Sequence, residues 1–198
     1  MSSLIHAKDL NFLLYQVFEA EQLTELNRYK EHDKTTFDSI LNTAQGIATD
    51  YFVPHNAKAD QNEPIFDGAN VKTIPEVKIA WQQYAASGLL SAQHDYEHGG
   101  MQLPTLIHMA CHSFFMSANP STAAYPFLTA AAANLIQAFA APQHKQIFLP
   151  AMFDGRFAGT MALTEPNVGS SLGDLTTKAI PDRKSTRLNS SHQIISYA

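Results

Sequence analysis

The sequence predicts an α+β fold in which a mainly helical domain is followed by the start of a β-domain. Apolar residues recur at helical spacing through most of the first 155 residues, whereas strand-like sequence, FAGTMAL, begins only after Arg156. Helices that come first and strands that come second indicate segregated layers or separate domains, not alternating βαβ units. With 198 residues and 45% hydrophobic content, the chain is large and apolar enough to build a real core.

The first two helices are expected within the first 60 residues. One runs from Asp9, a suitable N-cap residue, to about Leu26. The next begins near residues 33–36 and carries an apolar stripe to about Tyr51. Pro54 is expected to kink or end this helix, with an imperfectly helical continuation beyond it.

Prolines and glycines mark the boundaries of the middle helices. Residues 61–75 contain two prolines and one glycine, which indicates a surface loop. Pro75 suits the first turn of a third helix, and Gly88 suits the position just after its end. A polar loop over residues 91–100 follows, and Pro104 opens the fourth helix.

The fifth helix is the Ala-rich stretch over residues 123–141. Its length is close to that of a membrane span, but it is rich in Ala rather than Leu. Four residues interrupt its apolar character: Pro126, Thr129, Asn134 and Gln137. We therefore expect a fully buried helix and no membrane span. Pro142 starts a short sixth helix, and Asp154-Gly155 turns the chain after it.

Charge and known motifs exclude some classes of function. The formal net charge is −5, and the last sixteen residues contain three basic and no acidic side chains. The body of the chain is therefore still more acidic, and it has no basic stripe, so nucleic-acid binding is not expected. Neither G-x-G-x-x-G nor the P-loop pattern occurs, so nothing supports dinucleotide or NTP binding by those routes.

The cellular compartment is predicted from cysteine usage and from the N-terminus. Cys111 is the only cysteine, so no internal disulfide can form, and a reducing compartment fits best. The N-terminal sequence MSSLIHAKDLNF has neither a basic segment nor a continuous apolar core and does not read as a signal peptide. A cytoplasmic location is expected.

The most informative segment is MALTEPNVGS, residues 161–170. It reads as a strand over Phe157–Leu163 that runs into a turn, in which Pro166 fixes φ and Gly169 permits unusual backbone angles. Hydroxyl groups and exposed backbone N–H groups together suit the phosphates or the ring edge of a cofactor. An ordinary strand-to-loop transition accounts for the same residue types.

The order T-E-P-x-x-G-S after a small-residue strand resembles the flavin-contacting segment of acyl-CoA dehydrogenases. Two flanking regions strengthen the resemblance: the string GLLSAQHDYEHGGMQLP is similar to a family turn, and AAPQHKQIFLPAMFDGRFAGT to a family helix and turn. Within the second region and after the motif, the matching positions are Gln143, Lys145, Leu149, Pro150, Gly155, Thr176, Lys178 and Ala179. The resemblance covers roughly residues 4–182.

The resemblance implies a domain organisation. Residues 1–155 would be the family's helical N-terminal domain, and residues 156–182 the truncated start of its central β-domain. An extension over about residues 1–32 is similar to that of the large bacterial subfamily that includes methylmercaptopropionyl-CoA dehydrogenases.

The resemblance also implies an activity. The parent protein would be an FAD-dependent oxidoreductase of fatty acid metabolism and β-oxidation that converts an acyl-CoA thioester to the 2-enoyl-CoA. An electron-transfer flavoprotein would be its partner, and the full-length parent would form a homo-oligomer.

Functional residues carry over from the family position by position. The expected flavin contacts are Met161, Ala162, Leu163, Thr164, Gly169 and Ser170, and Ser170 would also reach the acyl-CoA. No catalytic residue is assigned, because the family's glutamate base lies in a C-terminal helical domain for which this chain has no residues. Glu165 follows Thr164 in the turn and is expected to be structural. Phe114, Phe115 and Phe127 are expected in the core, although in the family the following helices border the acyl pocket.

The sequence departs from the family at several positions. Ser171 stands where the family commonly has Asp, which removes a carboxylate beside the flavin loop. His94 and His98 replace residues of the family turn.

Two histidine clusters have residues that can bind metals, but neither is predicted to be a metal site. His108 and His112 are four residues apart on an expected helix, but no third ligand is evident, and we expect them on the helix surface. His94 and His98 form a similar cluster with Asp95 or Glu97 in a loop. Cys111 is expected to be inert core, and no metal is predicted.

After Asp182 the composition changes abruptly to the basic, Ser-rich string RKSTRLNSSHQIISYA. It resembles an adapter-derived sequence, so residues 183–198 are expected to be non-native. The alternative is a divergent hairpin with Ile194-Ile195 as a strand. A β-domain that stops after two strands leaves an uncovered edge, so the chain alone is expected to bind FAD poorly and to be inactive.

Two further functions remain as alternatives. One is a non-enzymatic helical module of the same fold that binds a partner or an acyl chain. The other is kinship to the DNA-binding alkylation-response branch of the family, which the acidic body disfavours.

Overall fold

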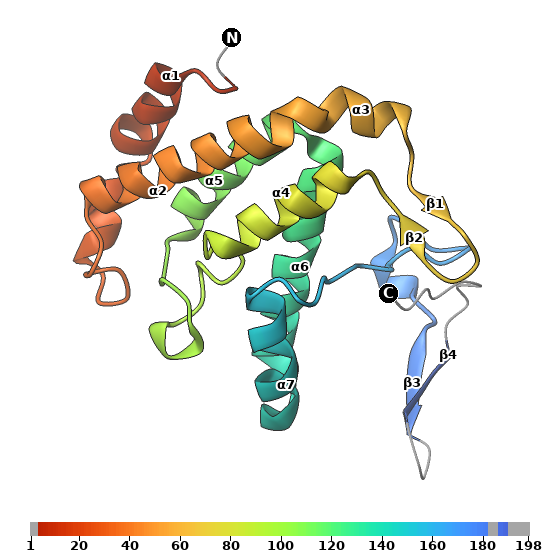
Figure 1. Cartoon of the computed structure of the whole chain (residues 1–198). Coiled ribbons are helices and arrows are strands. Elements are labelled where there is room, and N and C mark those ends of the chain that lie inside the picture. Colours follow the sequence, from red (N-terminus) through yellow and green to blue (C-terminus); the bar gives the residue numbers. More distant parts are fainter. Residues whose placement is uncertain (1–3, 182–185, 190–198) are drawn as a thin grey trace. The chain divides into compact units, whose positions relative to one another are not determined.

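The computed structural model describes residues 4–181 and 186–189 (Figure 1). Contacts divide the chain into two compact units, one ending at Thr160 and one beginning at Met161. The first is helical and contains most of the described residues, so the predicted mainly helical α+β class is confirmed.

The helical unit contains seven α-helices among its described residues and one short hairpin. The helices are α1 (Ala7–Phe12), α2 (Lys34–Ile47), α3 (Asn56–Gln61), α4 (Pro75–Ala86), α5 (Thr105–Ala118), α6 (Pro120–Phe139) and α7 (Pro142–Phe153). The hairpin pairs β1 (Ile65–Phe66) with β2 (Val71–Lys72) in antiparallel register. Short 3₁₀ turns cover Ala20–Glu25, Val53–His55 and Tyr96–His98.

The second unit contains an antiparallel pair of strands. Strand β3 (Lys178–Pro181) pairs with β4 (Thr186–Asn189), and a 3₁₀ turn covers Leu172–Asp174. Strand β4 lies within the segment predicted to be non-native, a prediction that stays open. The alternative strand at Ile194-Ile195 lies outside the described residues.

The prediction of one continuous helix from Asp9 to Leu26 is wrong. Helix α1 passes into a π-helical segment, Leu13–Val17, and the chain then breaks at Glu19, whose φ of 47° is left-handed. Asp9 lies inside the first turn, because the N-cap residue is His6. Within the π segment Leu14 is buried, whereas its neighbour Leu13 is exposed.

The second helix follows its local signals. The Asp33 carboxylate caps α2 by accepting a hydrogen bond of 2.7 Å from the Thr36 N–H. Pro54 has no N–H to donate, and the helix adapts through a π segment, Ala48–Phe52, and a 3₁₀ turn before it resumes as α3. The imperfect continuation predicted beyond Pro54 is confirmed.

Local signals also set the middle helices. Pro75 occupies the first turn of α4, and Gly88 follows its C-cap with a φ of 77°, as the sequence predicts. The predicted loop over residues 61–75 is instead interrupted by the β1–β2 hairpin, whose four residues are all exposed. Asp67 closes the turn of this hairpin by accepting the Asn70 N–H at 2.8 Å.

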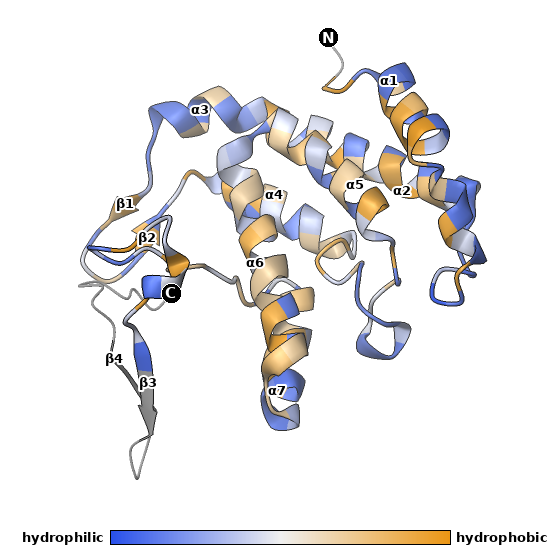
Figure 2. Ribbon diagram, turned by 180° about the vertical axis from the view of Figure 1, so that it is seen from behind, coloured by the Kyte–Doolittle hydropathy of each residue, from blue (hydrophilic) through white to orange (hydrophobic). Residues whose placement is uncertain are grey.

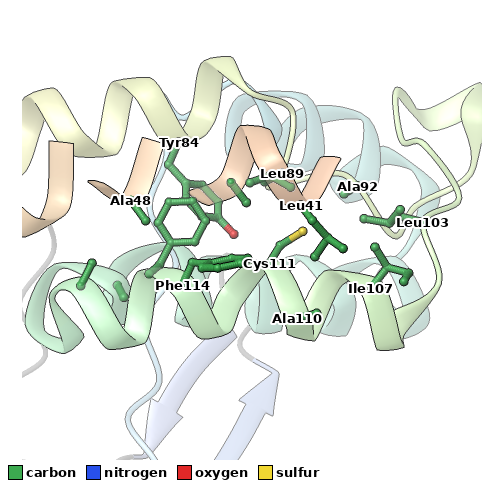
Figure 3. Packing of buried hydrophobic residues seen from close by; sticks show 14 of the residues in the cluster. Leu41, Ala48, Tyr84, Leu89, Ala92, Leu103, Ile107, Ala110, Cys111 and Phe114 are labelled. Carbon is green, nitrogen blue, oxygen red and sulfur yellow. The ribbon is translucent and has the colours of Figure 1, made fainter. Parts of the chain in front are cut away.

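The main core lies between α2, α4 and α5 (Figure 3). Three aromatic rings form its centre: Phe115 packs edge-on against Phe52 at 4.9 Å and against Tyr84 at 4.7 Å between ring centroids. Cys111 is 1% exposed in the same cluster, and burial raises the pKa of its thiol to about 12. The expectation that this cysteine is inert core is thus supported.

Helix α6 is half-buried, so the prediction that it would be fully buried is wrong. One face packs against α4, α5 and α7, and Ala133 shares a buried cluster with Leu149 and Met152 of α7. By contrast, Leu135 and Phe139 are 62% and 82% exposed. Apolar residues predominate along this helix, whereas α7 begins with polar residues (Figure 2). Asn119 caps α6 by accepting the Thr122 N–H. Across the described chain, we find no helix whose length and apolarity would let it cross a membrane.

Two glycines hold the chain against the helices after α7. Gly155 has a φ of 78°, and its carbonyl accepts a hydrogen bond of 2.8 Å from the Trp81 indole. Gly159 donates its N–H to the Thr129 hydroxyl at 2.8 Å, and a Cβ built on it would lie 2.6 Å from the Ala132 Cβ. The segment therefore runs in direct contact with α4 and α6.

The strand predicted over Phe157–Leu163 does not form. Phe157 lies in a bend, residues 158–163 have no regular secondary structure, and no described strand pairs with them. A strand needs a neighbour to bond its N–H and C=O groups, and here Gly159 bonds to a helix side chain instead. Residue type and alternation favoured a strand, but pairing is a tertiary property.

We predict that Gly159→Ala destabilises the helical unit by about 1–3 kcal/mol, because the added methyl group meets the Ala132 Cβ and the Thr129 backbone. Gly155→Ala should cost a similar amount through its positive φ and its contact with Ala85. Urea unfolding measures both. Gly46→Ala is the matched control: it lies in α2 with nothing within 4 Å of the new Cβ and should stabilise by about 0.5–1 kcal/mol. Equal stability of all three variants would contradict the close approach.

Candidate functional site

The segment that contains the motif lies at the beginning of the second unit. Residues 161–164 have no regular secondary structure, and residues 165–168 form a tight turn. In that turn Glu165 and Val168 exchange two backbone hydrogen bonds, of 2.8 and 3.1 Å. Both residues are buried, whereas the turn residues between them are exposed.

The Glu165 carboxylate ties this turn to the residues before β3. It accepts hydrogen bonds from the backbone N–H and the hydroxyl of Thr176, and from the same two groups of Thr177, at 2.5–3.1 Å. Its side chain thereby joins two segments eleven residues apart. The expected structural role of Glu165 is what this geometry supports.

The same contacts fix the charge of Glu165. Hydrogen bonds from Thr177, and then from Thr176, stabilise the ionised form and lower the pKa of the carboxyl to about 2. Both oxygens are occupied by donors. A carboxylate held in this way is a poor acceptor for a substrate proton at neutral pH.

The six predicted flavin contacts, residues 161–164 with Gly169 and Ser170, are all exposed. No hydrogen bond within the described chain uses the backbone groups of residues 161–164 or the hydroxyls of Thr164 and Ser170. These free donors and acceptors fit the polar edge of a flavin ring or a phosphate group. The residues present therefore fit the predicted cofactor chemically.

Gly169 does not adopt the unusual backbone angles that the sequence predicted for it. Its φ is not in the left-handed region, and a Cβ built there would meet nothing within 4 Å. The glycine is not required by its own neighbours. The space beside its backbone is open to an approaching group.

A cavity of about 140 Å³ lies in the helical unit, bordered by α4, α5, α6 and the loop after α4. Its lining is Tyr84, Gln93, His108, Met109, His112, Pro126, Phe127, Ala130, Ala131 and Asn134. Phe127, predicted to be core, is 48% exposed and stacks on the His112 ring at 4.9 Å between centroids. Phe114 and Phe115 are buried in the core as predicted.

His108 and His112 are buried, so the prediction that they lie on the helix surface is wrong. The His108 ring bonds to the Leu89 carbonyl at 3.2 Å. Burial lowers the pKa of His108, and it lowers the pKa of His112 to about 4, with a smaller contribution from neighbouring His108. Both rings are therefore neutral at pH 7. Their spacing of four residues identified a shared helix face, but not that this face turns inward.

The second histidine cluster is only partly assembled. Within the described residues, one group of three potential metal ligands lies together, formed by Asp95, Glu97 and His98, with ligand atoms within 4.8 Å of one another. Asp95 is already paired with the Arg28 guanidinium at 2.5 Å. His94 is not in the group; it is buried against Phe153, and burial lowers its pKa.

The sequence matches a known protein family. The family profile for the acyl-CoA dehydrogenase N-terminal domain matches residues 35–156. A butyryl-CoA dehydrogenase of Syntrophomonas wolfei is 30% identical over 182 residues, 90% of this chain and 30% of the relative. The 3-methylmercaptopropionyl-CoA dehydrogenase of Ruegeria pomeroyi is 27% identical over 179 residues, with the same coverage. The chain thus spans about 30% of the length of these curated relatives.

Structural comparison agrees on the fold. The glutaryl-CoA dehydrogenase of Mycobacterium smegmatis superposes with a TM-score of 0.65 at 18% identity, over 78% of this chain and 37% of that one. At this identity the likeness establishes the fold alone.

We predict that Glu165→Gln loosens the link between the turn and residues 176–177. The folded carboxyl pKa of about 2 lies below its ordinary value of 4.5, so its stabilising effect is complete above pH 4.5 and is lost as pH falls towards 2. Amide NMR signals of Thr176 and Thr177 should lose exchange protection in the variant at pH 7, and in the wild type only below pH 4.5. Asp174→Asn, an exposed acid in the same segment, should change neither signal.

We also predict that His112 makes the helical unit sensitive to acid. Its folded pKa of about 4 lies below the ordinary value of 6.5, so the stability that depends on the neutral ring is present above pH 6.5 and is lost as pH falls to 4. With allowance for water that reaches the ring, this is roughly 1–2 kcal/mol. Urea midpoints at pH 7 and pH 4.5 should differ less in His112→Leu than in the wild type. Equal differences would contradict a neutral buried ring.

Proposed function

Because the chain belongs to the acyl-CoA dehydrogenase family, we propose that its residues form the N-terminal part of an FAD-dependent acyl-CoA dehydrogenase. The reaction would remove hydrogen from the α and β carbons of an acyl-CoA thioester and give the 2-enoyl-CoA. The observation that carries the proposal is the exposed segment 161–164, whose backbone groups are free and which follows the family's helical domain.

Residues of the second unit would hold the cofactor. The backbone of Leu163 and Thr164, with the Thr164 hydroxyl, would bind the polar edge of the flavin ring, and Met161 and Ala162 would lie against it. Gly169 and Ser170 would bind the pyrophosphate, and the Ser170 hydroxyl would also reach the acyl-CoA. When bound, FAD accepts the hydride that leaves the substrate β carbon.

Glu165 would serve the site by position and not by proton transfer. Its carboxylate holds the turn that carries Gly169 and Ser170 against Thr176 and Thr177. A site of this kind depends on rigid support, because small displacements of binding groups cost affinity and rate. We assign removal of the α-proton to no residue of this chain.

The wider biochemical setting follows from the same proposal. The cavity between α4, α5 and α6 would receive the acyl chain, since it is mostly apolar and lies in the family's helical domain. An electron-transfer flavoprotein would reoxidise the flavin, and the parent protein would be a homo-oligomeric enzyme of fatty acid β-oxidation in the cytoplasm.

The test compares the chain with the longest reading frame that contains residues 1–182 at its locus. We expect the longer protein to purify yellow with stoichiometric flavin and to bleach anaerobically on addition of butyryl-CoA or another short acyl-CoA. The 198-residue chain alone should retain little flavin. If no acyl-CoA bleaches the flavin of the longer protein, the proposed function is rejected. If the 198-residue chain alone holds stoichiometric flavin that an acyl-CoA bleaches, the expectation that it is inactive alone is rejected.

Variants in the longer protein test the assigned residues. Thr164→Val and Ser170→Ala should each weaken flavin retention by roughly tenfold, the net value of one strong hydrogen bond. Asn167→Ala is the matched control, because it is exposed in the same turn but has no proposed flavin contact. If all three variants retain flavin equally, the residue assignment is wrong.

A further inference from the structure

The cavity bordered by α4, α5 and α6 contains two polar side chains that no hydrogen bond satisfies. Tyr84 is 2% exposed and His112 is 5% exposed. Within the described chain, neither the Tyr84 hydroxyl nor a His112 ring nitrogen has a hydrogen-bond partner, although His112 stacks on Phe127. Buried polar groups are normally paired, so two unpaired ones beside one cavity indicate a ligand that pairs them.

Both groups keep some accessible surface. The buried polar atoms that are sealed and unpaired in the described residues are His32 Nδ1, His55 Nδ1, Glu76 Oε2 and Gln137 Oε1. The Tyr84 hydroxyl and the His112 nitrogens are not in that set, so they keep some accessible surface. Both residues border this cavity.

The chemistry of the lining restricts the ligand. The cavity has no Lys, Arg, Asp or Glu in its lining, and its histidines are neutral because burial disfavours their charged form. A carboxylate or ammonium group would enter without a partner charge, which is strongly unfavourable. Tyr84 donates a hydrogen bond through its O–H, and a neutral imidazole can donate through one nitrogen. A neutral acceptor atom fits both.

The volume restricts the size of the ligand. A dry cavity of roughly 150 Å³ holds one benzene-sized molecule. The cavity here, at about 140 Å³, suits a group of similar bulk.

We propose that Tyr84 and His112 select, in this cavity, a short acyl group whose distal end carries a neutral hydrogen-bond acceptor, such as an ether, hydroxyl or carbonyl oxygen. The acyl part of this inference rests on the proposed function; the pairing of a neutral acceptor rests on the cavity alone. An acyl group without such an atom would leave both donors unpaired and would bind less well.

The cavity is tested with two rings of the same shape, tetrahydrofuran and cyclopentane, which differ in one acceptor oxygen. The probes are titrated into the 198-residue chain with isotope-labelled His and Tyr, and the ring signals of His112 and Tyr84 are followed by NMR. We expect saturable shifts of both signals with tetrahydrofuran. If neither probe binds saturably, for example because only water occupies the cavity, the inference is overturned.

Variants separate hydrogen bonding from shape. Tyr84→Phe removes only the hydroxyl, and His112→Leu replaces the ring by an apolar group of similar volume. Each should shift the ratio of the two dissociation constants towards cyclopentane by about three- to tenfold. His112→Gln should restore part of the preference. His144→Gln, exposed on α7, is the control and should leave the ratio unchanged. An unchanged ratio in both Tyr84→Phe and His112→Leu would overturn the inference.

The probes contain no thioester and need no flavin, so their result is independent of the proposed function. In the flavin-containing protein, kcat/KM for 4-methoxybutyryl-CoA relative to hexanoyl-CoA should fall three- to tenfold in Tyr84→Phe. Selective probe binding without turnover of any acyl-CoA would reject the proposed function and support the cavity chemistry. Turnover without this selectivity would reject only the further inference.

Discussion

The segment after α7 lies very close to helices α4 and α6, and this close approach fixes how the helical unit ends. Gly159 lies where even one methyl group would meet the Ala132 Cβ, and Gly155 has a backbone angle that favours glycine. The Thr129 hydroxyl completes this contact, because it accepts the Gly159 N–H and donates to the Tyr125 carbonyl. One buried side chain thus satisfies backbone groups of a helix and of the segment that crosses it.

Hydrogen-bond satisfaction separates structural polar groups from the candidate functional ones. In the interior, the His55 ring pairs with the Thr122 hydroxyl at 2.8 Å, and Asn119 both caps α6 and donates to the Phe52 carbonyl. Such pairs fix the helices in place and leave little capacity for a ligand. Tyr84 and His112 are as deeply buried but unpaired. The His55 Nδ1 atom is unpaired too, but it is sealed within the core, whereas Tyr84 and His112 border a cavity.

Much of the helical unit could be predicted because its signals are local. A cap such as Asp33, or a proline such as Pro75, acts on backbone groups within one turn, and the sequence alone contains that information. Errors arose where tertiary contacts decide: the broken first helix, the exposed face of α6 and the absent strand at 157–163. Each depends on what lies beside the segment. Residue periodicity does not specify that neighbour.

The motif segment could be predicted from the sequence, whereas the cavity in the helical unit could not. The order of residues 161–170 identified the motif, and the exposure of the six predicted flavin contacts agrees with a binding role. The hydrogen bonds from Thr176 and Thr177 to the Glu165 carboxylate were not predicted, although both hydroxyl residues lie close to Glu165 in the sequence. The cavity was missed, because it arises only when three helices pack. The one available signal was the four-residue spacing of His108 and His112, which placed both on one face of α5.

Glu165 and His112 show how the environment sets what each titratable group can do. Glu165 is ionised and surrounded by donors, so taking up a proton would break hydrogen bonds that hold its turn. His112 is neutral and unpaired, so it is free to bond to a ligand without a change of charge. A general base needs an accessible lone pair and a pKa near the working pH, and Glu165 has neither. If the proposed reaction takes place, Glu165 contributes through the rigidity of the turn, and a residue other than Glu165 accepts the α-proton.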